Sequence, residues 1–160
     1  MKTLLLFLLL LTTFFCKAQN EISISKLQKF LSAKVIDDVE NDLKSLNYSF
    51  REAETISDGT SKLLYERINS KTYALDFIAF FKNKSNVGFS GISFNTYEEQ
   101  QFHNLKTEFT AISKIQGSAE EVSDGCLERT YNTKQYQFHF NICTEKSNER
   151  TLYRIEILNL

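Results

Sequence analysis

The stretch YQFHFNIC, from Tyr136 to Cys143, alternates large apolar residues with polar ones. Successive side chains of a β-strand point to opposite faces of a sheet, so the even-numbered residues here would face a core and the odd-numbered ones water. Such alternation is typical of an antiparallel sheet that is covered on one side only. The stretch therefore predicts a strand of this kind, with the inward residues Tyr136, Phe138, Phe140 and Ile142.

The residues before this strand predict its partner. A two-residue turn at Lys134 and Gln135 would place Cys126 directly opposite Cys143 and would pair apolar residues with apolar ones along both strands. A four-residue loop would put the two cysteines on a diagonal, about 7–8 Å apart at Cβ, which is too far for a bridge. We therefore predict a hairpin closed by a disulfide between Cys126 and Cys143, which would stabilise the fold by about 3 kcal/mol.

A metal site or a catalytic site is the alternative use for these residues. His103 and His139 are the only histidines of the chain, and neither has the spacing to other ligands that a metal site requires. A catalytic His139 would need a nucleophile or a carboxylate such as Glu128 within reach, and no nucleophile-elbow pattern is present. We therefore predict no catalytic, metal or cofactor site, and we interpret both histidines as surface residues.

Two further stretches predict strands. LYRIEIL, residues 152–158, alternates cleanly and points Tyr153, Ile155 and Ile157 inward. In YALDFIAFF, residues 73–81, Ile78 and Phe80 make the second face apolar as well. We expect the rest of the chain to cover these two residues; the alternative is an exposed patch for a partner. The face of this strand that we expect to lie in the core consists of Tyr73, Leu75, Phe77, Ala79 and Phe81.

Two stretches follow the helical period instead. Between residues 24 and 46 apolar residues recur at steps of three and four, which predicts one amphipathic helix. Ser25 begins a capping-box pattern, so this helix is expected from Ser25 to residues 45–47. Thr96 begins a second such pattern, and the helix that follows it would bury Phe102, Leu105, Phe109 and Ile112.

The string Ser-Asp-Gly occurs at residues 57–59 and again at 123–125. A calcium loop would need several carboxylates at alternate positions, and these are missing around Asp58 and Asp124. A glycine with positive φ in a hairpin turn explains both copies, because glycine adopts that conformation without steric cost. We therefore predict two turns and not two ligand sites.

The two copies are accompanied by other matches in the same order along the chain. NSKTY at 69–73 matches NTKQY at 132–136, and KSN occurs at 84–86 and 146–148. This order predicts an internal duplication. We expect an α+β fold in one compact domain, made of two tandem helix-plus-antiparallel-meander units (α-β4-α-β4), residues 19–95 and 96–160, that share one core or sheet. In outline this is similar to cystatin-like folds, as a likeness of architecture alone.

The N-terminus predicts export. Lys2 is followed by an apolar run from Leu4 to Phe15, shorter than the roughly 20 residues that span a bilayer. A charged start, a short apolar middle and a small-residue exit are typical of a secretory signal peptide, here residues 1–18, with cleavage after Ala18. Lipidation at Cys16 is the disfavoured alternative, because Phe15 stands where a small residue is required. No later stretch predicts a transmembrane segment.

Composition narrows the class of function. The chain has 19 Lys and Arg against 20 Asp and Glu, and these charges are dispersed, so it lacks the concentrated positive patch that nucleic-acid binding needs. We expect an exported, non-enzymatic binding protein, inhibitor- or immunity-like, that engages a protein partner through a sheet face or loops. The alternatives are an envelope carrier or structural protein with an apolar cavity between helix and sheet, and a small secreted hydrolase.

Overall fold

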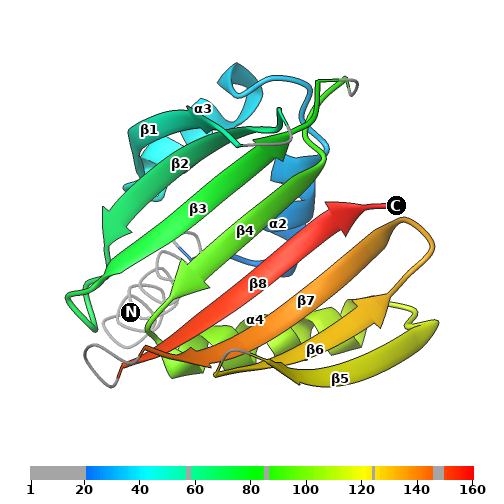
Figure 1. Ribbon diagram of the computed structural model, residues 1–160. Helices are drawn as coiled ribbons and strands as arrows, with labels where there is room; N and C mark the ends of the chain where they lie inside the picture. Colours follow the sequence, from blue (N-terminus) through cyan, green and yellow to red (C-terminus); the bar gives the residue numbers. More distant parts are fainter. Residues whose placement is uncertain (1–20, 57–58, 85–86, 124, 146–149) are drawn as a thin grey trace, which may run out of the picture.

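The computed structural model describes residues 21–56, 59–84, 87–123, 125–145 and 150–160. The predicted signal peptide with Cys16 lies outside the described residues, as do Asp58 and Asp124. Three helices, α2 (Ile24–Leu31), α3 (Asp37–Ser45) and α4 (Glu99–Ile112), pack on one face of the sheet in the described part of the chain (Figure 1). The strands are β1 (Ser49–Thr55), β2 (Ser61–Ile68), β3 (Leu75–Lys82), β4 (Gly91–Thr96), β5 (Gly117–Ser123), β6 (Cys126–Asn132), β7 (Tyr136–Thr144) and β8 (Thr151–Asn159).

The strands form one continuous antiparallel sheet in the order β1-β2-β3-β4-β8-β7-β6-β5. The prediction of two tandem helix-plus-meander units is therefore wrong. Helices precede each group of four strands along the chain, but β4 and β8 pair directly and join the groups into a single, mostly β structure. Helix α2 contacts both β4 and β8, and it also contacts α4, so no helix covers a separate meander. Half of the chain could bury little core alone.

The single helix expected from Ser25 is also wrong. It is divided into α2 and α3, and the N-cap of α2 is Ser23, whose hydroxyl accepts from the backbone N–H of Lys26. The break lies where the loop before β4 approaches the backbone: a Cβ at Gly88, which has φ +99°, would stand 3.1 Å from the carbonyl oxygen of Ala33. A contact between residues distant in sequence thus accompanies the break in a regular apolar period.

Helix α4 lies where the second helix was predicted, but its start differs. The N-cap is Glu98, and the hydroxyl of Thr96 accepts from the N–H of Glu98 and does not cap the helix. Glu108 ties this helix to α2, because its carboxylate accepts from the backbone N–H of Ile24 at 2.9 Å and of Ser25 at 3.1 Å. No helix in the described residues is long and apolar enough to cross a membrane.

The predicted hairpin is confirmed in register and in its disulfide. Cys126 pairs with Cys143 across β6 and β7 and is bonded to it. The turn closes as predicted, since the N–H of Thr133 donates to the carbonyl of Tyr136. Gly59 and Gly125 follow β1 and β5 with φ of +82° and +78°, as predicted for turn glycines.

The inward face of β3 was predicted wrongly. Ile78 and Phe80 are fully buried on the side of the helices, while Phe77 and Phe81 lie on the opposite side and are half-buried. Asp76 shares the helix side and is also buried. In the sequence, a charged residue suggests a solvent-exposed face. Here the carboxylate of Asp76 is buried because Arg67 and Asn69 donate hydrogen bonds to it.

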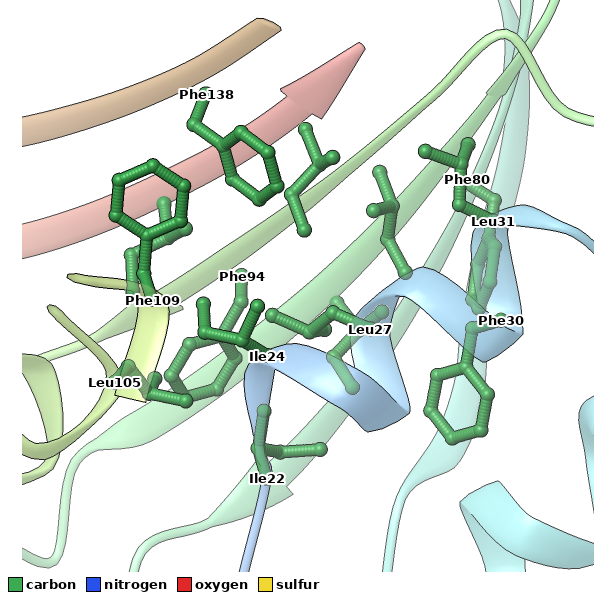
Figure 2. Close-up of a cluster of buried hydrophobic side chains, with 14 of the residues drawn as sticks. Ile22, Ile24, Leu27, Phe30, Leu31, Phe80, Phe94, Leu105, Phe109 and Phe138 are labelled. Carbon is green, nitrogen blue, oxygen red and sulfur yellow. The ribbon is translucent and has the colours of Figure 1, made fainter. Parts of the chain in front are cut away.

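Side chains fill the space between the helices and the sheet. Figure 2 shows the apolar residues of α2 pointing towards the sheet, and Phe109 of α4 beside Phe138 of β7, with ring centroids 4.5 Å apart. Residues of all three helices and of both strand groups belong to one buried cluster. The space in which the carrier hypothesis required a cavity is therefore packed. The core residues with no exposed surface include Ile24, Leu27, Phe30, Leu43, Ile78, Phe80, Phe94, Phe109, Phe138 and Ile157.

Candidate functional site

The side of the sheet that no described helix covers, here called the open face, carries the candidate site. The described helices lie behind the sheet in Figure 1, so this face is turned towards the viewer, and its side chains alternate with the core residues along each strand. A groove of about 560 Å³ runs over β1, β2, β3, β4 and β8 on this face. It is lined by Arg51, Glu52, Glu54, Ile56, Lys62, Leu64, Phe77, Ala79, Phe81, Ser93, Asn95, Tyr97, Glu145, Leu152, Arg154 and Glu156.

Part of the lining of this groove is apolar. Leu64, Phe77, Phe81 and Leu152 are half-buried there, although no described helix covers them. The uncovered face of an antiparallel sheet is normally polar. Strand β3 departs from this rule because it is apolar on both faces, one for the core and one for the groove. Large exposed apolar patches rimmed by polar residues mark interaction sites.

Charges of both signs border the apolar floor. Arg51 donates to Glu66 at 2.6 Å and its guanidinium lies 5.6 Å from the ring centroid of Phe77. Lys62 forms an ion pair with Glu54 at 2.6 Å. Each cation thus has a carboxylate beside it, so this border attracts neither a strongly acidic nor a strongly basic ligand.

Arg154 of β8 also lines the groove. Its Nε donates to Asn95 Oδ1 at 2.8 Å, and its Nη1 lies 3.7 Å from Glu156 Oε1. The Asn95 bond holds the guanidinium against the sheet, while 40% of the side chain stays exposed. Arginine in such a setting keeps donors for a partner.

Tyr97 closes one end of the groove. Its hydroxyl donates to Glu145 Oε1 at 2.7 Å. Burial and this hydrogen bond raise the pKa of Tyr97 to about 12. The phenol therefore stays neutral at physiological pH and supplies no charge to the groove.

The structure brings His139 and Glu128 together outside the groove, on the β6 and β7 part of the open face. His139 Nδ1 lies 2.7 Å from Glu128 Oε1, and Nε2 lies 3.0 Å from Gln137 Oε1. The Glu128 carboxylate only accepts, so Nδ1–H is the donor of that contact, and the Gln137 amide offers Nε2 either its oxygen or its NH2 group. Thr130 also donates to the same carboxylate oxygen. These contacts engage both ring nitrogens within this cluster.

The Glu128 contact predicts a pH effect on stability. The hydrogen bond from His139 holds the pKa of the Glu128 carboxyl below its usual value of 4.5. A carboxyl whose pKa is lower in the folded state than in the unfolded state stabilises the folded state at pH values above its unfolded pKa. This stability is lost as the pH falls through its folded pKa. We expect Glu128→Gln to flatten the fall in urea midpoint below about pH 4.5. His139→Leu should also flatten this fall. If both variants lose urea midpoint at low pH as steeply as the wild type does, the Glu128–His139 contact is not its cause.

The other predicted positions do not converge on the groove. His103 lies on exposed α4 surface, 3.4 Å from Glu99 Oε1, on the helix side of the sheet. Within the described residues no group of three or more His, Cys, Asp or Glu side chains is placed to hold a metal ion. The disulfide lies at one end of β6 and β7 and fastens their register.

Sequence reasoning missed the groove itself. Its residues come from β2 and β3 on one side and from β8 on the other, and only the β4–β8 pairing brings them together. The available signal was that residues 73–81 are apolar on both faces. The face that we predicted to lie in the core is the one that lines the groove. The wet side of LYRIEIL also contained Leu152 and Arg154. Comparison with protein-family models, with curated proteins and with solved structures finds no match to this chain.

Proposed function

We propose that this chain is an exported, non-enzymatic interaction protein that binds a protein partner through the groove of its open face. One observation carries the proposal: Leu64, Phe77, Phe81 and Leu152 form an apolar floor on a sheet face that no described helix covers. An inhibitor- or immunity-like role belongs to this class.

The border of the groove supports a protein as the occupant. Apolar residues at the centre with charged residues of both signs around them are the usual anatomy of a protein–protein interface. Arginine, as at Arg154, is among the residue types that carry most binding energy in such interfaces, and phenylalanine, as at Phe77 and Phe81, is enriched in them. A partner surface of matching chemistry would place apolar side chains over β3 and a carboxylate near Arg154.

Two observations support the non-enzymatic and exported parts of the proposal. Both ring nitrogens of His139 are engaged by Glu128 and Gln137, which favours a structural role for the histidine best placed for chemistry. The disulfide between Cys126 and Cys143 indicates an oxidising compartment. Export through the predicted signal peptide would supply that compartment.

Site-specific photo-crosslinking tests the function. A photoreactive phenylalanine analogue replaces Phe77 in the groove, and in a matched control it replaces His103 on the exposed surface of α4. In cells that export the full chain, we expect discrete protein adducts from position 77 that are absent from position 103. Protein adducts that are equal at both positions, or lipid adducts alone from position 77, would contradict a protein-binding groove.

A further inference from the structure

On three adjacent strands, β3, β4 and β8, the open face carries pairs of residues that lie two positions apart and have complementary properties. On β8, Arg154 and Glu156 lie two positions apart and point to the same side. On β3, Phe77 and Ala79 have the same relation. Strand pairing aligns these residues in rows, because Phe77 pairs with Asn95 and Asn95 with Arg154. The next row contains Ala79, Ser93 and Glu156.

We propose that the partner of the open face is a second copy of this chain, stacked face to face about a two-fold axis. This inference rests on the proposed function and names its partner. The axis crosses the strands at the row of Ile78, Phe94 and Ile155, whose side chains point into the core. A two-fold contact is self-complementary, so each residue on one side of the axis meets the residue that lies equally far on the other side.

The row next to the axis satisfies this rule. Arg154 of one copy meets Glu156 of the other, so opposite charges face each other twice in one contact. Phe77 meets Ala79, which is only 3% exposed and forms the floor of the groove, so a large side chain enters a hollow. Asn95 meets Ser93, which is only 3% exposed and accepts from Asn95 Nδ2 of its own chain at 3.1 Å, so this position brings two uncharged polar residues together.

The second row out from the axis satisfies it too. On β8, Leu158 meets Leu152, and on β3, Phe81 meets Leu75, so apolar residues face apolar ones. On β4, Gly91 meets Tyr97, the residue that follows the strand; the side chains of Leu158 and Phe81 lie over Gly91, so the Tyr97 ring meets an apolar surface there. The matching ends at β2, where Leu64 would meet Glu66. The contact is therefore centred on β3, β4 and β8.

Stacked sheets pack about 10 Å apart with interdigitating side chains, which the Phe77 rings over the Ala79 hollows allow.

The test is the oligomeric state of the purified mature protein and of charge-reversed variants. Sedimentation equilibrium over a dilution series is expected to give twice the chain mass for the wild type. Arg154→Glu and Glu156→Arg each bring like charges together twice, so each should weaken association by at least about 100-fold. The double variant, Arg154→Glu with Glu156→Arg, restores opposite pairs and should dimerise again. Lys44→Glu on α3, on the helix side, is the control that should leave the dimer intact.

The outcomes separate this inference from the proposed function. A monomeric wild type, a dimer that tolerates either single reversal, or a double variant that fails to dimerise while its circular dichroism is native would overturn the second copy as occupant. The function would then still stand if position 77 crosslinks to a different protein. An adduct of twice the chain mass, mapped from position 77 to the peptide that contains Ala79, would support both.

Discussion

Replacing Phe109 with alanine is expected to lower the free energy of unfolding by about 3–5 kcal/mol. Phe109 has no exposed surface, and its ring centroid lies 4.5 Å from that of Phe138, 5.2 Å from that of Tyr131 and 5.3 Å from that of Phe140. The substitution removes these ring contacts, and the cavity cannot close because the neighbouring rings belong to paired strands. Urea unfolding of the oxidised protein, followed by circular dichroism, measures the loss.

Ile112 provides the matched control. It lies one turn after Phe109 on α4 and is 51% exposed, although the apolar period predicted it to be buried. Ile112→Ala should lower the free energy of unfolding by less than about 1 kcal/mol, as surface substitutions usually do. Comparable losses in the two variants would mean that α4 does not anchor the sheet through Phe109.

The hairpin around the disulfide could be predicted from the sequence because every constraint on it is local. Clean alternation assigns the faces of 136–143, and the cysteines restrict the turn to one length. The helix before β1 shows the opposite case. Its apolar period is regular, yet the chain breaks between α2 and α3, at the place where Gly88, distant in sequence, approaches Ala33.

The pairing of β4 with β8 could not be predicted, because nothing local in either strand specifies it. A duplicated pattern suggested separate units, whereas Ile92 of β4 lies directly opposite Ile157 of β8 in one sheet. The candidate site could not be predicted for the same reason, since Phe77 and Arg154 come to line one groove only through that pairing. Residues 75–82 also show that period two identifies two faces but not which face the helices cover.

Burial separates two ion pairs of otherwise similar chemistry. Glu66 and Arg67 are adjacent on β2, so their side chains point to opposite faces of the sheet. On the helix side, Asp76 is 0% exposed and accepts from Arg67 Nε at 3.2 Å and Nη2 at 3.1 Å. On the open face, Glu66 accepts from Arg51 at 2.6 Å, and the two side chains are 29% and 43% exposed.

Asp76→Ala is expected to lower the free energy of unfolding by about 3–5 kcal/mol, because it leaves the guanidinium of Arg67 buried without a counter-charge. Arg67 is only 13% exposed and its guanidinium lies 4.8 Å from the ring centroid of Tyr48, so it cannot turn to water without breaking that packing. Urea unfolding at neutral pH measures the loss.

Glu66→Ala removes the same kind of partner from an exposed pair and should cost less than about 1 kcal/mol. The double variant Arg67→Met with Asp76→Leu removes both buried charges, so it should be more stable than Asp76→Ala although it changes more atoms. If the double variant is the less stable of the two, the pair contributes through attraction and hydrogen bonds to Asn69. If it is the more stable, the cost of Asp76→Ala is that of an unpaired charge in the core.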